Sequence, residues 1–266
     1  MAKQSGIHQL RGKVGEHSYY RQSGVTSGLV RGINPAMSGR VKNGDEYANT
    51  RLNNAEFRNA AALASAMGGI IQPKYRPMIL PFSQSKLTKN YLSLIKEAAG
   101  EWGQRNAVAT QQQRIADYLN ELAKTRFTDL FSDVDPIVVP SGSTSVEVSS
   151  GWSADQSNLM SSMGIDGVVV KVTPVRLLVG EYDSTIGKNR ATFSTLGTSS
   201  FEDNEITPGE SLSFDTAITP GSANVPGFVG MLYVIIVAMP YRIIAGVKHT
   251  LQEHCTYKCV PLTYAH

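Results

Sequence analysis

Apolar residues recur at helical spacing in the first half of the chain and at strand spacing in the second half. The helical spacing predicts amphipathic helices over residues 45–68, 84–99 and 107–126. The segment Gln72–Pro81 contains three prolines and cannot form the interior of a helix. Gly68-Gly69 predicts the end of the first helix. We therefore expect an α-helical region over residues 45–134.

From Asp135 onward, short runs of β-branched and aromatic residues alternate with turn residues. The continuously apolar run Leu232–Val237 predicts a strand that is buried on both faces. The number of strands fits an antiparallel β-sandwich of immunoglobulin-like size over residues 135–266, which we expect to fold independently. The predicted strands are Pro136–Val139, Ser143–Ser149, Gly167–Val179, Ala191–Leu196, Ser211–Ile218, Gly230–Met239 and Glu253–Pro261.

The beginning of the chain is rich in Gly, Ser, Arg and Tyr and contains few large apolar residues. Short runs at Glu16–Arg21 and Gly28–Ile33 predict a hairpin or an extended arm over residues 1–44. An isolated hairpin is marginally stable in water, so we expect this arm to need a neighbour. Together these patterns predict an α+β protein with a basic N-terminal arm or hairpin, an α-helical region and a C-terminal antiparallel β-sandwich.

Charge changes sign along the chain. Residues 1–126 contain 18 Lys and Arg against 8 Asp and Glu, whereas residues 127–266 contain 7 against 14. This asymmetry indicates either a polyanionic partner for the basic half or head-to-tail packing between copies of the chain.

The longest apolar stretch, Val229–Met239, is too short to cross a bilayer, and Met1–Leu10 lacks the apolar segment of a secretory signal. We therefore expect no membrane partner.

Motifs that carry catalytic or metal chemistry are weak. Gly180–Lys188 superficially suggests a phosphate-binding loop, but its spacing is wrong and it is better explained as a β-turn. Cys255 and Cys259 have His249 and His254 nearby, but no second cysteine pair completes a zinc site. We expect both to be buried free thiols, and we predict no catalytic residues, no metal and no cofactor.

The basic arm carries the clearest functional signal. Residues 1–44 contain seven Lys and Arg against one acidic residue, with tyrosines between them. Cations and aromatic faces suit nucleic acid, but the same arm can also pair with acidic patches on a neighbouring subunit, which is the interpretation we prefer. The candidate subunit-interface residues are Arg11, Lys13, Tyr19, Tyr20, Arg21, Arg31 and Arg40 in the basic half and Glu202, Asp203, Glu205 and Glu210 in the acidic half.

The N-terminal motifs also resemble those of a known group of proteins. The run Gly12-Lys-Val-Gly-Glu-His-Ser-Tyr-Tyr-Arg21 is followed by Leu29-Val-Arg31, Thr50-Arg51, Glu56-Phe-Arg58 and Ile71-Gln-Pro73. This order resembles Bacteroidetes phage and prophage structural proteins, including some from crAss-like phages, over about residues 1–100. The resemblance implies a non-enzymatic virion protein, present in many copies in a tail or neck (connector) ring. Its implied partners are other copies of itself and neighbouring tail or portal proteins, and the particle would be assembled in the bacterial cytoplasm.

Overall fold

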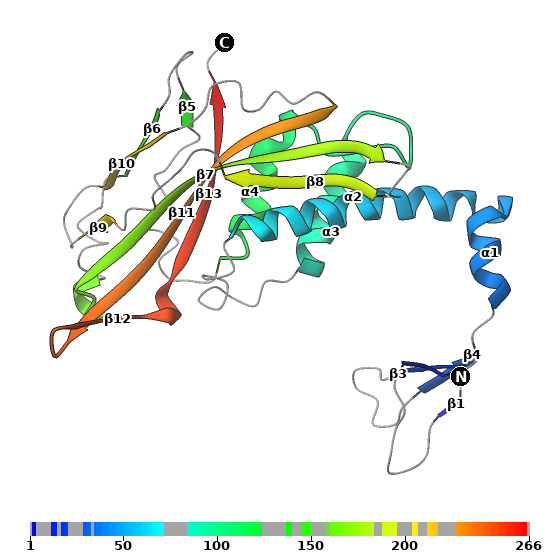
Figure 1. Ribbon diagram of the computed structural model, residues 1–266, viewed down its shortest axis with the longest axis horizontal. Coiled ribbons are helices and arrows are strands. Elements are labelled where there is room, and N and C mark those ends of the chain that lie inside the picture. The colour runs from blue at the N-terminus through cyan, green and yellow to red at the C-terminus, as the bar shows by residue number, and fades with distance from the viewer. Residues whose placement is uncertain are drawn as a thin grey trace. The chain divides into compact units, whose positions relative to one another are not determined.

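The computed structural model divides the chain into two compact units, Met1–Asn54 and Ala55–His266 (Figure 1). It describes residues 2–3, 12–14, 17–20, 29–32, 35–71, 84–123, 137–139, 145–150, 158, 160–183, 188–195, 204–206, 212–217 and 227–264.

The N-terminal unit contains a small antiparallel sheet followed by a helix. The sheet has the strand order β1-β4-β3-β2, with β1 at Ala2–Lys3, β2 at Gly12–Val14, β3 at His17–Tyr20 and β4 at Leu29–Gly32. The predicted hairpin is present as β3 and β4. The predicted arm, however, ends in a helix, because α1 (Pro35–Asn43) begins at a proline whose fixed φ suits the first helical position. A short helix, η1 (Asp45–Tyr47), follows.

Each of the three predicted helices overlaps a helix of the described chain. They are α2 (Ala48–Ile70), which begins in the N-terminal unit, α3 (Gln84–Glu97), and α4 (Gln112–Asn120), which follows the short η3 (Ala109–Gln111). The helix α4 is shorter than predicted, and α2 continues through Gly68-Gly69 to Ile70. Most of the predicted apolar stripes are buried: Leu63 and Met67 of α2 and Leu87, Leu94 and Ile95 of α3 have no exposed surface. Phe57, which the helical spacing also placed on the apolar face of α2, is instead 52% exposed.

The second unit is built around two long antiparallel strands, β7 (Gly167–Asp183) and β11 (Phe228–Ile244), of 17 residues each. The strands β8 (Lys188–Thr195) and β9 (Asn204–Ile206) pair with β7, while β13 (Thr256–Tyr264) and β12 (Val247–Thr250) pair with β11. The strand β5 (Ile137–Val139) runs parallel to the end of β13. A separate pair is formed by β6 (Ser145–Ser150) and β10 (Leu212–Ala217), and η5 (Gln252–His254) precedes β13.

Every strand predicted from the sequence is present, and β9 and β12 are additional. Gly180–Lys188 connects the antiparallel strands β7 and β8, since Asp183 pairs with Lys188. This hairpin connection agrees with the predicted turn, because a phosphate-binding loop would lead from a strand into a helix.

The central part of the large sheet is buried on both faces. On one face the side chains contact α2, α3 and α4 in a single apolar core. The run Leu232–Val237 lies in β11, and each of its residues is at most 5% exposed, as its continuous hydrophobicity predicted. The helix-facing residues include Val175, Leu177, Tyr233, Ile235, Tyr257 and Cys259. The opposite face includes Val168, Val170, Leu232, Val234, Ile236, Val260 and Leu262.

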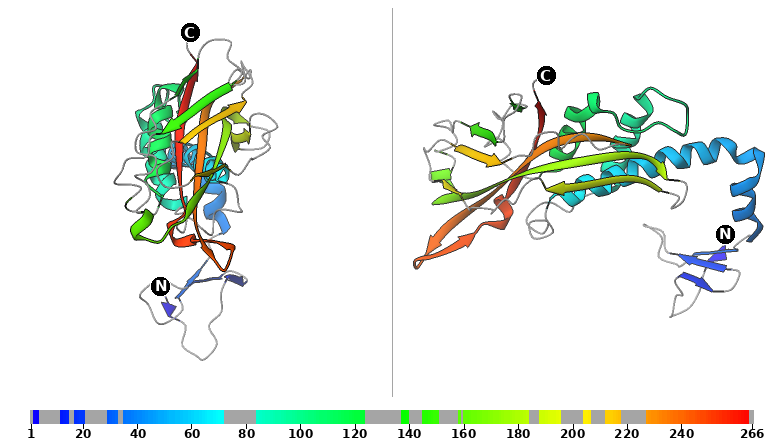
Figure 2. Two further views of the ribbon diagram at one scale, coloured as in Figure 1. Left: turned by 90° about the vertical axis from the view of Figure 1, so that its left-hand side faces the viewer. Right: turned by 45° about the horizontal axis from the view of Figure 1, so that its top comes forward.

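The α+β class is confirmed. We expected a helical region separate from an independent β-sandwich, but in the structure the helices and the large sheet share one core. The helices cover one face of the large sheet, whereas β6 and β10 lie on the other side of β13 (Figures 1 and 2). The physical reason is that amphipathic helices and the sheet each have an apolar surface to bury, and each covers the other. Residues 135–266 therefore share their core with residues 60–122.

Helix α4 is attached to the sheet by hydrogen bonds at both ends. The Asn120 side chain accepts from the Cys259 N–H at 2.7 Å and donates to the Cys259 carbonyl at 2.9 Å. At the other end, Gln112 Nε2 donates to the carbonyls of Leu232 and Leu262. Between them, the Tyr257 hydroxyl donates to the Leu119 carbonyl at 2.6 Å. These contacts satisfy backbone groups of β13 on the side that α4 covers.

Gly69 lies where α2 approaches the sheet closely. A Cβ atom on Gly69 would come within 2.4 Å of the Phe193 ring on β8. The Phe193 ring is 39% exposed, so it can move aside at moderate cost. We predict that Gly69→Ala lowers the free energy of unfolding by about 1 kcal/mol relative to Gly39→Ala, and urea denaturation measures this difference. Gly39→Ala is the matched control, since no atom lies within 4 Å of that Cβ position in α1. It should be neutral or slightly stabilising. An equal loss in both variants would contradict the close contact.

Candidate functional site

An open pocket, which we call the α2 pocket, lies beside the middle of α2. Its walls are α2, the segment 103–107, the end of β7 and the beginning of β11, and its volume is about 770 Å³. This size is typical of pockets that bind a ligand or a short segment of a partner. Its polar lining residues are Arg58, Asn59, Gln104 and Asn106, and its apolar ones are Ala55, Ala107, Val179, Phe228 and Val229, with glycines at 103, 180 and 227.

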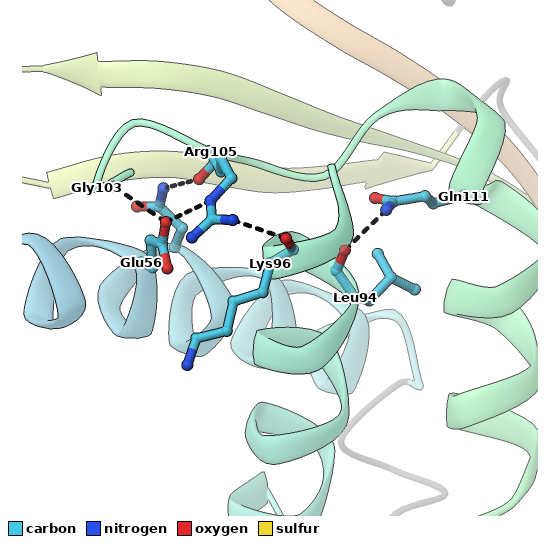
Figure 3. Close-up of polar contacts among 7 residues, drawn as sticks. Glu56, Leu94, Lys96, Gly103, Arg105 and Gln111 are labelled. Carbon is cyan, nitrogen blue, oxygen red and sulfur yellow. Dashed lines mark hydrogen bonds and ion pairs between the residues drawn. The ribbon is translucent and has the colours of Figure 1, made fainter. Parts of the chain in front are cut away.

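A buried ion pair holds the 103–107 wall against α2 (Figure 3). Glu56 is fully buried, and its Oε1 accepts hydrogen bonds from Arg105 Nε at 2.7 Å and from the Gly103 N–H at 3.0 Å. Arg105 also donates to the Lys96 carbonyl at the end of α3, at 2.8 Å. One carboxylate on α2 therefore fixes both the backbone and a side chain of the wall.

The electrostatics of this pair follow from its surroundings. Burial alone would raise the pKa of Glu56. The hydrogen bonds from Arg105 and Gly103, together with the positive charges of Arg105 and Lys96, outweigh this effect and lower the pKa below its ordinary value. Glu56 is therefore ionised at neutral pH, and its contribution to stability is lost as the pH falls below the ordinary carboxyl range.

Amide side chains complete the wall. Asn59 donates to the Arg105 carbonyl at 2.7 Å, and Asn106 donates to the Gly180 carbonyl of β7 at 2.9 Å. At the following turn, Gln111 donates to the Leu94 carbonyl at 2.8 Å (Figure 3). The wall is therefore tied to α2, to α3 and to the sheet, so the pocket is formed before any partner binds.

The side chains that line the α2 pocket are amides, one guanidinium and small or apolar groups. None of its lining residues in the described part of the chain is a Ser, Cys, His, Asp or Glu. Among the lining residues, the Arg58 guanidinium and the Gln104 amide are hydrogen-bond donors, and Val229 and Phe228 offer apolar surface. The exposed Trp102 precedes Gly103 in the same wall. An apolar segment with polar backbone groups fits this arrangement.

A second surface feature lies at the other end of β11. The hairpin of β11 and β12 projects from the sheet and carries three large apolar side chains (Figure 1). Ile243, Ile244 and Val247 are 49%, 54% and 57% exposed. We call these three residues, together with the connecting Ala245 and Gly246, the hairpin tip. A cluster of exposed branched aliphatic residues on a narrow projection is typical of an interaction site.

The hairpin is braced at its base. Arg242 donates from Nε to the Gly164 carbonyl at 2.6 Å and from Nη2 to the Met163 carbonyl. The Asp166 carboxylate accepts from the Ile243 N–H at 2.6 Å. Lys248 lies 5.0 Å from the centre of the Tyr241 ring, a cation–π contact. These contacts hold the tip away from the sheet in a defined orientation.

The candidate interface residues fall in both units. Lys13, Tyr19, Tyr20 and Arg31 lie in strands of the N-terminal unit, and Glu205 lies in β9 of the second unit. Arg40 of α1 forms an exposed ion pair with Glu46 at 3.0 Å. Arg11, Arg21, Glu202, Asp203 and Glu210 lie outside the described residues. Neither the α2 pocket nor the hairpin tip was predicted from the sequence.

Cys255 and Cys259 are free thiols and both are buried, as predicted. Burial raises the pKa of Cys255 to about 11 and raises that of Cys259 further. Within the described part of the chain, no group of three or more His, Cys, Asp and Glu side chains is arranged to hold a metal. The helices of that part also include none that is long and apolar enough to span a membrane.

No protein-family model matches the chain, and no curated protein matches it.

The Glu56–Arg105 pair should be important for stability. We predict that Glu56→Gln lowers the free energy of unfolding by about 2–4 kcal/mol, because it removes the partner of a largely buried arginine. Denaturant unfolding at neutral pH measures the effect. Glu46→Gln is the matched control: it breaks the exposed pair with Arg40 and should leave stability unchanged within error. Similar stabilities for the two variants would show that the buried pair does not hold the wall.

The buried thiols and tyrosines predict a loss of stability in alkaline solution. Burial raises the pKa of Cys255, Cys259, Tyr91, Tyr233 and Tyr257 above their ordinary values. The unfolded chain therefore releases these protons first, and the free energy of unfolding falls as the pH rises above about 9. Denaturation at a series of pH values between 8 and 11 measures this. Replacing both cysteines by alanine should reduce the decline, and a flat profile would contradict the burial of these groups.

Proposed function

We propose that this protein is a non-enzymatic structural component of a bacteriophage virion, present in many copies in a ring of the tail or neck. The observation that carries the proposal is the hairpin tip, where hydrogen bonds hold three apolar side chains in contact with water. Such a surface gains stability only when a partner covers it.

Two features of the sequence support the same proposal. The motifs within about residues 1–100 resemble those of Bacteroidetes phage structural proteins. The opposite charges of the two halves favour heterologous contacts, in which one surface of a subunit binds a different surface of the next. Contacts of this kind close into rings when the rotation between subunits permits it.

The proposal assigns a role to each part of the chain. The basic residues 1–44 contact neighbouring copies or other tail and portal proteins, with Lys13 and Arg31 among the contacting residues. In the second unit, β6 and β10 form a second layer over the sheet face away from the helices, giving a local β-sandwich. The close approach of β10 to β7 and the burial of Val168 and Val170 support this arrangement.

A second candidate function is nucleic-acid binding through the basic arm. The balance of seven Lys and Arg against one acidic residue in residues 1–44 favours it. Titration with DNA at increasing salt distinguishes the two functions. A phosphate-binding arm must lose affinity steeply as the salt concentration rises, whereas a subunit-binding arm should show no appreciable DNA affinity at physiological salt.

Deletion of residues 1–31 tests the role of the arm. The described core of the second unit is formed by residues from Ala60 to Cys259, so the truncated protein should keep its circular dichroism spectrum and its cooperative unfolding. We predict that its incorporation into the assembly is lost, as measured by native mass spectrometry and negative-stain imaging. If the truncated protein assembles as efficiently as the full chain, the arm is not an assembly element and nucleic-acid binding becomes the better explanation.

A further inference from the structure

The two surface features of the second unit are complementary in shape and chemistry. The hairpin tip is a narrow projection of branched aliphatic side chains around a two-residue turn, and the α2 pocket is an open cavity whose lining includes the apolar residues Val179, Phe228 and Val229. We propose that the hairpin tip of one copy inserts into the α2 pocket of the next copy. This inference rests on the proposed function and specifies the contact by which the subunits assemble.

The geometry of β11 requires the contact to be between copies. The pocket includes Phe228 and Val229 at the start of this strand, and the tip begins at Ile243 near its end. At about 3.3 Å per residue, the 17 residues of β11 separate the two features by roughly 50 Å along the strand. A tip therefore cannot reach the pocket of its own chain. Since one strand carries both features, every copy presents them in the same relative orientation.

The dimensions also agree. A pocket of about 770 Å³ lies within the range of pockets that bury most of a drug-sized ligand. With their backbone, residues Ile243–Val247 contain about 32 non-hydrogen atoms, which is comparable to such a ligand. Gln104 lines the pocket, and its amide can donate a hydrogen bond to a carbonyl of the turn.

The backbone of the turn is consistent with this role. Ala245 has φ of 52° and Gly246 has φ of 80°, the positive values of a type I′ turn. Alanine is disfavoured in this region relative to glycine or asparagine. Ala245 therefore places a small apolar side chain in the turn, where asparagine would bring a polar amide into the pocket.

The contact is small. A tip of five residues is far below the roughly 800 Å² per partner that is typical of stable complexes, so one contact alone should be weak. In a closed ring each copy makes two such contacts. The last contact forms within one assembly, so its effective concentration is high and the ring is more stable than a single contact. We therefore expect association to depend on protein concentration.

Complementary variants of the full chain test the inference. Ile244→Asp/Val247→Asp removes the apolar tip, and Val229→Arg fills the pocket. Each variant alone should raise the concentration needed for assembly at least tenfold in sedimentation velocity. An equimolar mixture should form dimers and nothing larger, because only one functional tip and one functional pocket remain for each pair. Val138→Arg is the matched control, since Val138 is an exposed strand valine, 64% exposed, outside both features.

Disulfide capture decides the question even if association is weak. A chain with both Val247→Cys and Val229→Cys should form a ladder of covalent oligomers under mild oxidation, and the two single variants mixed should give dimers only. Cys255 and Cys259 are each 1% exposed and should not react. Absence of the ladder, or equally abundant covalent dimers from the chain that carries only the tip cysteine, overturns the inference. Assembly that is unaffected by both variants overturns it while leaving the proposed multi-copy function intact.

Discussion

The attachment of α4 to β13 is the interaction on which the second unit depends. A strand with an unpaired edge exposes a row of backbone donors and acceptors, and here the Asn120 amide and Gln112 bind backbone groups of residues 259 and 262. The same helix buries Ile115 and Leu119 against the sheet. Helix α4 therefore both hydrogen-bonds to backbone groups of the sheet and covers its apolar side chains. Because only one placement of α4 satisfies both, its position on the sheet is fixed. That position also sets where α3 and the 103–107 wall lie relative to the start of β11.

Much of this fold could be predicted from the sequence because the local signals are strong. The run Leu232–Val237 indicated a strand buried on both faces, and the spacing of Leu87, Tyr91, Leu94 and Ile95 indicated the buried face of α3. What could not be predicted was the partner of each face. An apolar stripe indicates that one face of an element will be buried. Which other element covers that face depends on the tertiary fold of the whole chain. Helices were therefore assigned to a region of their own, although they complete the core of the sheet.

The candidate site was less predictable for a related reason. The α2 pocket is assembled from residues near positions 55, 104, 180 and 228, which no local pattern connects. One usable signal was Glu56, a carboxylate on the apolar side of a predicted helix, where burial requires a partner such as Arg105. The hairpin had a weak signal as well. Ala245-Gly246 lacks the Asn-Gly or Asp-Gly pair that usually marks a tight turn, and the flanking isoleucines are of a residue type that is more often buried than exposed.

The strand β11 contributes both to the stability of the core and to the two surface features. Its middle is buried on both faces, and its two ends carry the pocket wall and the base of the hairpin. A strand that is packed on both sides has little freedom to bend, so the orientation of the tip relative to the pocket is fixed by the core itself. Substitutions in the core of β11 would therefore alter the angle between two surfaces that they do not touch. In a closed ring that angle determines the number of subunits, so the packing of residues such as Tyr233 and Ile236 would contribute to the symmetry of the assembly as well as to the stability of the fold.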